Sequence, residues 1–315
     1  QYGRWGYFMT EVKAFYLYYL KLLFFPINLN VNPDFPFSPS LWQTISLLIL
    51  TSFGLIFLAK YSKKKPLLIF SVLWMLITLS PTSSIVPLND LVSEHRLYLP
   101  SLGFFIAISL TIGEPIRISK TVKTVFVMAL LTVFSILTVE RNSVWKDATS
   151  LWEDAVKKSP LNARSYVNAG RSYYFKKMPK KAVLAYEKAN KINPFQFQPH
   201  YNIATIYQEW GNYEEAIKEF SIALQLKKNL PDAYINLGII YLDQKKYDTA
   251  ISMFNAAINL RTNCSTCFRS LAVIYYYHLK DYKKAKFYFQ QTLKFDPEQN
   301  QKQEIQSILN SLNAF

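Results

Sequence analysis

The chain has 315 residues, of which half are hydrophobic and 18% are charged, and its formal net charge is +15. This length suits two modest domains, and two cysteines are too few for a disulfide framework. A basic balance suits nucleic acid or an anionic membrane surface, but the long apolar segments described next argue against a nucleic-acid partner. Residues 141–315 hold 25 of the 36 Lys and Arg residues, and this shift in composition predicts a domain boundary near residue 140.

Residues 1–140 contain uncharged apolar runs that predict a membrane domain. A bilayer core takes about 20 apolar residues in a helix, so we expect about four transmembrane helices. An earlier stretch, Ala14–Phe25, is shorter and carries Lys21, and we expect it to be an interfacial helix or part of a further span. The four runs are Leu41–Ala59, Pro66–Val86, Leu97–Gly113 and Thr124–Val139.

Basic residues in the short loops predict the topology of these spans. Three lysines, Lys63 to Lys65, lie between the first two runs, and Arg117, Lys120 and Lys123 lie between the third and fourth. Positively charged short loops face the cytoplasm. The loop Ser80–Pro100 and everything after Glu140 would then lie outside the cytoplasm, in the ER lumen, the periplasm or at the cell exterior.

Residues 141–315 show a period of 34 residues, the length of a tetratricopeptide (TPR) unit. The period predicts repeats near 163–196, 197–230, 231–264 and 265–298, with a partial unit before them and a capping helix after them. We therefore expect an all-α chain in which polytopic transmembrane helices precede a TPR helical solenoid. The residues that repeat are small at Gly170, Ala204, Gly238 and Ala272, and aromatic at Tyr186, Phe220, Phe254 and, after a one-residue insertion near His278, Phe289.

The first helix of each repeat should line the concave face of the solenoid. Asparagine recurs there at Asn168, Asn202 and Asn236, and a side-chain amide both donates and accepts hydrogen bonds. Such a row can hold the backbone of an extended polypeptide, as in the asparagine ladder of O-linked N-acetylglucosamine transferase, which it resembles. Arg171 and Tyr201 are further candidates for this groove. The alternative is that Asn is simply common at this position in TPR units.

Cys264 and Cys267 form a C-x-x-C pattern at the start of the fourth repeat. Without a second pair the pattern is poor support for a metal site. A local disulfide is open to a domain outside the cytoplasm, but we expect two small thiols that pack between helices. Asn263 begins a glycosylation pattern that also arises by chance. We expect no metal or nucleotide site, because there is no phosphate-binding glycine loop and the chain has only three histidines.

Three ionisable residues, Glu94, His95 and Arg96, stand together at the edge of the third apolar run. Ionisable groups at a membrane boundary are costly unless they are paired, solvated or used in function. Arg96 could clamp a phosphate, His95 could donate to the same anion, and Glu94 could hold either of them in place. The alternative is an interfacial salt bridge that anchors the helix end, with Tyr98 in the aromatic belt.

Three stretches resemble segments of the transmembrane and TPR-containing (TMTC) family and its bacterial relatives. They are EHRLYLPSLGF from Glu94, YYLKLLFFPINLNVNPDFP from Tyr18, and RNSVWKDATSLWEDAVKKSPLNARSYVNAG from Arg141. The family is similar to the GT-C membrane glycosyltransferases, which transfer a sugar from a lipid phosphate to a protein hydroxyl. The resemblance implies O-mannosyl transfer from a dolichyl or polyprenyl phosphate, with Arg96 near the donor phosphate. It supplies no catalytic role for Glu94.

We expect this chain to be a piece of a longer protein. The resemblance implies that the catalytic acidic residues lie in the first outward loop of that protein, upstream of Gln1. The favoured hypothesis is a fragment of an integral-membrane protein O-glycosyltransferase whose TPR domain binds the polypeptide acceptor. The alternative is a membrane-anchored TPR scaffold or assembly factor without catalysis. Polypeptide and membrane lipid are the expected partners, and apart from the lipid-linked sugar donor no cofactor is evident.

Overall fold

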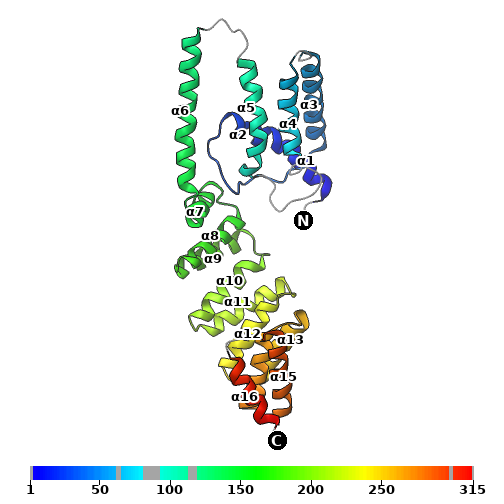
Figure 1. Ribbon diagram of the computed structural model, residues 1–315, viewed down its shortest axis with the longest axis vertical. Helices are drawn as coiled ribbons and strands as arrows, with labels where there is room; N and C mark the ends of the chain where they lie inside the picture. Colours follow the sequence, from blue (N-terminus) through cyan, green and yellow to red (C-terminus); the bar gives the residue numbers. More distant parts are fainter. Residues whose placement is uncertain (1–2, 62–64, 81–92, 113–118, 298–300, 314–315) are drawn as a thin grey trace. The chain divides into compact units, whose positions relative to one another are not determined.

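The computed structural model describes residues 3–61, 65–80, 93–112, 119–297 and 301–313. These residues form helices joined by loops, and no strand occurs among them (Figure 1). The predicted all-α class is therefore confirmed. The chain divides into two compact units, residues Gln1–Ser172 and Tyr173–Phe315.

The first unit begins with a continuous helical stretch, in which α1 (Arg4–Ala14), the π-helical turn η1 (Phe15–Tyr19) and α2 (Leu20–Phe24) follow one another. The other elements are α3 (Leu41–Tyr61), α4 (Pro66–Leu79), the 3₁₀ turn η2 (Glu94–Leu97), α5 (Tyr98–Ile112), α6 (Lys120–Val144), α7 (Ala148–Lys158) and α8 (Ala163–Phe175), which continues into the second unit. The start of α7 is capped by Asp147, which accepts hydrogen bonds from the backbone N–H groups of Thr149 and Ser150, as short acidic side chains do at helix starts.

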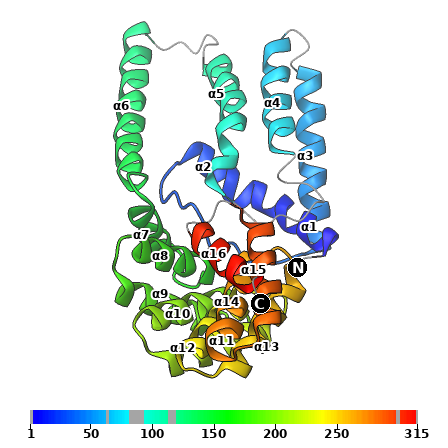
Figure 2. The same cartoon turned by 60° about the horizontal axis from the view of Figure 1, so that its bottom comes forward.

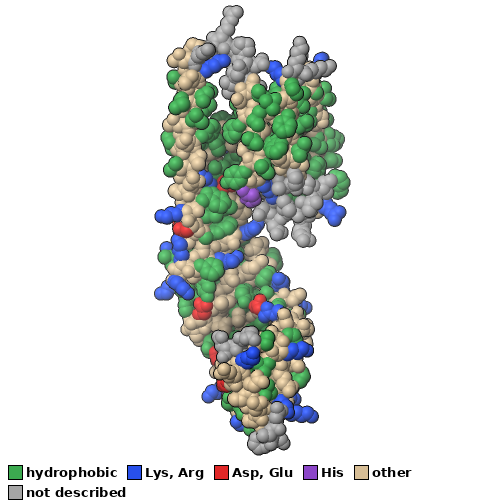
Figure 3. Space-filling view, in the orientation of Figure 1, with side chains coloured by type: hydrophobic (Ala, Val, Ile, Leu, Met, Phe, Trp, Pro, Cys, Tyr) green, Lys and Arg blue, Asp and Glu red, His purple; other side chains and the backbone are tan. Residues whose placement is uncertain are grey.

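Two helices in the described part of the chain, α3 and α6, are long and apolar enough to cross a membrane, over Leu41–Lys60 and Thr121–Val144. Only 6% of the first apolar window and none of the second is buried inside the protein. Figure 3 shows hydrophobic side chains spread over the surface of α3 to α6. A large exposed apolar surface of this kind marks a site of contact with a membrane or with another protein.

The other two predicted spans correspond to the shorter helices α4 and α5. Their packing is close, because a Cβ atom at Gly103 of α5 would collide with the backbone carbonyl of Ser71 in α4. The indole of Trp74 donates to the carbonyl oxygen of Leu99 at 3.0 Å. Residues 81–92, and with them most of the predicted outward loop, lie outside the described residues, as do Lys63, Lys64 and Arg117.

The second unit consists of paired antiparallel helices, which Figure 2 shows from a second direction. Its aromatic positions Phe220, Phe254 and Phe289 are at most 2% exposed. A Cβ atom at Gly238 would lie 2.6 Å from the ring of Phe254, so the small residue is needed where the aromatic ring fills the pair. The helices are α9 (Pro179–Ile192), α10 (Phe197–Glu209), α11 (Tyr213–Leu226), α12 (Pro231–Asp243), α13 (Tyr247–Leu260), α14 (Ser265–Val273) with the π-helical turn η3 (Ile274–His278), α15 (Tyr282–Phe295) and α16 (Lys302–Asn313).

The turns between paired helices repeat one backbone device. A residue with positive φ follows the first helix of each pair, at Lys177, Gly211, Lys245 and Lys280, with φ between 57° and 76°. Only Gly adopts this region without a steric cost, so three of the four turns carry some strain. The fourth turn comes one residue late, because the inserted residue of that repeat is taken up by the π-helical turn η3.

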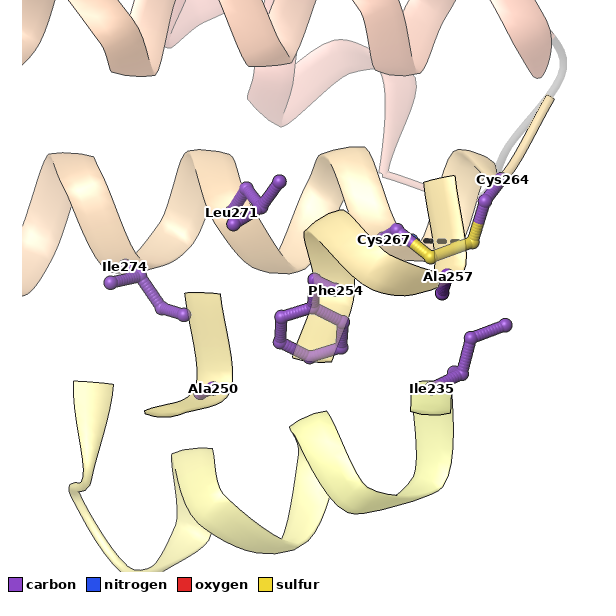
Figure 4. Packing of buried hydrophobic residues seen from close by; sticks show 8 residues of the cluster. All are labelled: Ile235, Ala250, Phe254, Ala257, Cys264, Cys267, Leu271 and Ile274. Carbon is purple, nitrogen blue, oxygen red and sulfur yellow. Dashed lines mark hydrogen bonds between the residues drawn. A yellow bond between two sulfur atoms is a disulfide. The ribbon is translucent and has the colours of Figure 1, made fainter. Parts of the chain in front are cut away.

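Cys264 and Cys267 form a disulfide at the start of α14, with their Cα atoms 5.3 Å apart. The prediction of two unpaired, helix-packing thiols was therefore wrong. The physical reason is local, because the first turn of a helix brings residues three apart together. Figure 4 shows the disulfide beside the buried cluster of Phe254, Ala257 and Ile235.

Candidate functional site

The segment Glu94–Leu97 forms a 3₁₀ turn that leads directly into α5. Within this turn, the residue Arg96 is 9% exposed. Arg96 Nη1 donates to Glu11 Oε1 at 3.2 Å and to the hydroxyl of Tyr19 at 3.3 Å. The backbone N–H of Ser93 also donates to the Tyr19 hydroxyl, at 3.4 Å. The turn is thus attached to the first helical stretch of the chain by a buried ion pair and a shared phenol.

Burial and the neighbouring groups act in opposite directions on the pKa of Arg96. Burial alone would lower the pKa of Arg96, but Tyr19 and Glu11 raise it above its ordinary value. Arg96 therefore remains a cation opposite the buried Glu11. Removing one member of such a pair leaves an uncompensated buried charge, so this contact is a strong constraint on the position of η2.

Glu94 contacts neither His95 nor Arg96 in the way the sequence suggested. It forms an ion pair with Arg141 near the end of α6, a contact of the kind that the salt-bridge alternative described. In a 3₁₀ turn, adjacent side chains project in different directions, and Glu94 and Arg96 consequently pair with different elements. Arg141 also donates to Asp154 Oδ2 at 3.0 Å, and Lys158 contacts Asp154 Oδ1 at 2.8 Å.

Four residues, Glu94, Arg141, Asp154 and Lys158, form a row of alternating acidic and basic contacts. This row is called the relay below, and the name implies no proton transfer. Lys158 also donates to the backbone carbonyl of Leu29 at 2.7 Å. The relay therefore connects η2, the end of α6, α7 and the loop after α2, four segments that are far apart in sequence.

His95 is exposed, unlike its two neighbours. Its Nδ1 atom lies 2.7 Å from the hydroxyl oxygen of Ser93, and that hydroxyl donates to the carbonyl oxygen of Val31 at 3.4 Å. The three candidates of the Glu94–Arg96 motif are therefore adjacent in sequence, but each has a different partner. Whether any of them contacts a donor phosphate stays a prediction.

An apolar cavity lies next to the Glu94–Arg141 pair and will be called the relay cavity. Its volume is about 180 Å³, below the roughly 300–1,000 Å³ of pockets that enclose a whole small ligand. Phe105 of α5 and Phe134 of α6 line it, with ring centroids 6.3 Å apart. The remaining lining residues are Leu22, Leu23, Pro26, Leu29, Glu94, Leu97, Tyr98, Ser101 and Arg141.

The loop between α2 and α3 makes a second, polar set of contacts, with the connection between α7 and α8. Asn30 Nδ2 and the backbone N–H of Asp34 both donate to Ser159 Oγ, at 2.8 and 2.9 Å. Asn32 Nδ2 donates to Asn162 Oδ1 at 3.0 Å and to Ser165 Oγ at 3.1 Å. The start of α8 is thereby held against the same loop that Lys158 contacts.

The groove candidates fall in both units. Asn168 and Arg171 lie on α8 within the first unit, whereas Tyr201 and Asn202 lie on α10 and Asn236 on α12 in the second. Asn236 Nδ2 donates to the Tyr201 hydroxyl at 3.4 Å. The structure thus brings Tyr201 and Asn236 together across neighbouring repeats, and peptide binding by this set stays a prediction.

Sequence reasoning missed Glu11 and Arg141 as partners of the Glu94–Arg96 motif. Glu11 is the first acidic residue of the chain and lies in an apolar stretch, and Arg141 follows the last apolar run after Glu140. An ionisable group beside an apolar stretch is costly unless it is paired or solvated, so each was a signal that a partner existed. Neither signal identified which partner, because the pairs are 85 and 47 residues apart.

The repeats and the relatives of the chain agree with this architecture. Two models described as tetratricopeptide repeat match residues 163–196, and residues 196–263 and 230–298. The chain is 30% identical over 139 residues to protein O-mannosyl-transferase TMTC4 of Mus musculus. The matched region covers 42% of this chain and 19% of that protein. It is 27% identical over 143 residues to TMTC3 of Mus musculus, with 44% of this chain and 15% of that protein covered.

Among solved structures, that of YrrB, "a TPR protein with an unusual peptide-binding site", resembles part of the chain. The TM-score is 0.45 and the identity 21%, over 55% of this chain and 89% of YrrB. The chain spans less than a fifth of the length of its TMTC3 and TMTC4 relatives, at 15% and 19%. The predicted resemblance is confirmed over the TPR-containing region, where the curated relatives of this chain are TMTC protein O-mannosyl-transferases.

Proposed function

We propose that this chain is part of an integral-membrane protein O-glycosyltransferase that takes its sugar from a lipid phosphate. The observation that carries the proposal is the likeness of the TPR-containing region to protein O-mannosyl-transferases. In the proposed reaction, the bond between the anomeric carbon and the donor phosphate oxygen breaks. A bond to a serine or threonine hydroxyl oxygen forms, the hydroxyl proton passes to a base, and the phosphate leaves on the lipid.

The membrane placement is part of the same proposal. The exposed apolar surfaces of α3 and α6 support two spans, and we assign α4 and α5 to two more. The lysines before α4 and near the start of α6 then face the cytoplasm. In this topology the η2 turn, the relay and the TPR repeats all lie outside the cytoplasm, where lipid-linked sugars are used by enzymes of this kind.

The TPR repeats are proposed to hold the polypeptide acceptor. Stacked repeats present a continuous concave surface, and the amides of Asn202 and Asn236 can hydrogen-bond an extended backbone. Tyr201, the partner of Asn236, adds a half-buried aromatic ring. Holding the acceptor hydroxyl near the donor would supply much of the rate enhancement through proximity.

A reconstituted transfer assay tests the proposal. The protein expressed from its complete gene is placed in liposomes with a polyprenyl phosphate that carries labelled mannose, and with extended peptides that contain Ser and Thr. Transfer of label to the peptides is expected. An Asn202→Ala, Asn236→Ala double variant should weaken peptide binding and reduce transfer, while Asn310→Ala on the final helix serves as the matched control.

Absence of transfer with all donors, together with retained peptide binding, would contradict the enzyme proposal and favour the membrane-anchored scaffold. Loss of neither activity in the double variant would contradict the assignment of the asparagine residues. The two outcomes are independent, because the first concerns the reaction and the second concerns the groove.

A further inference from the structure

The relay cavity combines an apolar body with one polar end. Its apolar lining includes Leu22, Leu23, Leu97 and the two Phe rings, and these side chains come from α2, η2, α5 and α6. Among the described residues, Glu94 and Arg141 alone bring charges to it, and the two charges are opposite. This division matches an elongated amphiphile whose chain occupies the apolar part and whose head group meets the ion pair.

The polar end retains bonding capacity that the described residues do not use. Arg141 Nε and Glu94 Oε2 are both buried and have no hydrogen-bond partner within the described part of the chain. A buried donor or acceptor without a partner is costly and calls for an explanation. One of these atoms is a cationic N–H donor and the other is a carboxylate acceptor, so the two require complementary groups on a ligand.

The two atoms together call for a head group that has both an acceptor and a donor. A phosphate oxygen accepts from a guanidinium N–H in a charge-assisted bond, and a sugar hydroxyl donates to a carboxylate oxygen. A fatty-acid carboxylate supplies a partner for Arg141 only. A lipid phosphate that carries a hydroxyl-bearing group supplies partners for both, and the sugar-linked donor of the proposed reaction is such a lipid.

We infer that the relay cavity is the binding site for the donor, a polyprenyl phosphate-linked sugar, with Arg141 contacting the phosphate and Glu94 a sugar hydroxyl. This inference rests on the proposed function and deepens it by assigning the site to Arg141 instead of Arg96. Arg96 is engaged by Glu11 and Tyr19 and does not line this cavity. Arg96 then acts as a positioning residue, because its ion pair fixes the η2 turn that carries Glu94.

A binding measurement with a defined probe tests the inference. The probe is a short-chain polyprenyl phosphate mannose that carries a photoreactive group on its chain, and the full chain is held in lipid nanodiscs. Binding to Arg141→Gln should be weaker by about tenfold or more, because a charged hydrogen bond is lost. Photolabelled peptides should map to α2, α5 and α6. Arg4→Gln, the same substitution at an exposed arginine, should bind as the unchanged protein does.

A second variant keeps the test decisive if Arg141→Gln fails to fold, since that change leaves Glu94 and Asp154 without their cation. Ser101→Phe places a ring into the cavity and leaves the ion pair intact; the Ser101 hydroxyl bonds only to the carbonyl of its own helix at Tyr98. We expect Ser101→Phe to reduce probe binding to a similar extent while the unfolding temperature is retained. Unchanged binding by a folded Arg141→Gln or Ser101→Phe would overturn the inference.

The sugar contact is tested separately with Glu94→Gln. The unchanged protein should prefer the mannose-bearing probe to the same polyprenyl phosphate without sugar, and Glu94→Gln should reduce that preference. Equal binding of the two lipids by the unchanged protein would overturn the role of Glu94. Probe binding that depends on Arg141, in a protein that transfers no sugar, would contradict the proposed function but uphold the binding site. Full transfer activity in Arg141→Gln would contradict the binding site but uphold the proposed function.

Discussion

The two units of this chain differ in what they bury. In the first unit Glu11, Glu94 and Arg96 are each less than 10% exposed, whereas the one buried polar side chain among the described residues of the second unit is Thr292. The second unit is held by small and aromatic residues that fit one another in every repeat. Buried charges are weak contributors to net stability, so their concentration in the first unit marks the region where position matters more than packing.

The largest expected effect comes from removing an aromatic residue of the repeat core. Phe254→Ala should cost about 3–5 kcal/mol of unfolding free energy, because it leaves a cavity in a tightly packed pair. Chemical denaturation of the full chain, followed by the far-UV helix signal, measures the change. Phe287→Ala, at a 51% exposed aromatic position, is the matched control and should cost much less. Equal costs at the two positions would contradict the packing account.

An effect of similar size is expected from breaking the buried ion pair of the first unit. Glu11→Leu should cost about 3–5 kcal/mol, because Arg96 would be left buried without its carboxylate. Adding Arg96→Leu should recover much of that loss, as apolar replacements of both partners often do. Thermal unfolding in detergent compares the three proteins. A double variant that is less stable than Glu11→Leu would contradict the explanation and point to the Tyr19 contact instead.

Smaller effects are expected at the left-handed turns of the second unit. Gly211→Ala should cost about 1 kcal/mol, because Gly211 has φ of 76° and an added Cβ is strained there. Lys245→Gly, at the corresponding turn with φ of 59°, should cost nothing or stabilise slightly, since relief of strain offsets the greater entropy of the unfolded chain. Denaturation midpoints of the two variants should therefore move in different directions or by clearly different amounts.

The smallest effect concerns pH and the Tyr174–Glu209 hydrogen bond. This bond raises the pKa of Tyr174 to about 12. Because the folded pKa lies above the value of 10.0 for a free tyrosine, the contribution is fully present below pH 10 and is lost as the pH rises toward 12. The stability difference between the unchanged protein and Tyr174→Phe should shrink over that interval. A difference that stays constant from pH 8 to 12 would contradict the assignment.

The repeat architecture could be predicted because its physical requirement is local and periodic. Each helix pair needs a small residue opposite a large ring, as at Gly238 and Phe254. Small and aromatic residues therefore recur at a fixed spacing that the sequence alone reveals. The ion pairs could not be found in this way. Glu11 and Arg96 are brought together by the packing of distant segments, and neither the charge nor the spacing of a residue specifies its tertiary partner.

The cysteine pair shows a different limit of sequence reasoning. A spacing of three places two side chains near each other on a helix, but it does not decide between free thiols and a disulfide. That choice depends on the local geometry at the start of α14, where Cys264 precedes the helix and Cys267 lies in its first turn. The pattern indicated proximity, and only the structure resolved the bond.

The π-helical turn η3 has a consequence for how such repeats diverge. One added residue in an ordinary α-helix rotates everything after it by about 100°, since a turn takes 3.6 residues, and would carry the packing face away from its neighbour. A wider turn over Ile274–His278 absorbs the addition locally, and Phe289 is still only 2% exposed. A single-residue insertion within this helix is therefore tolerated without loss of the core, and a comparison that assumes a constant repeat length will misalign the fourth unit.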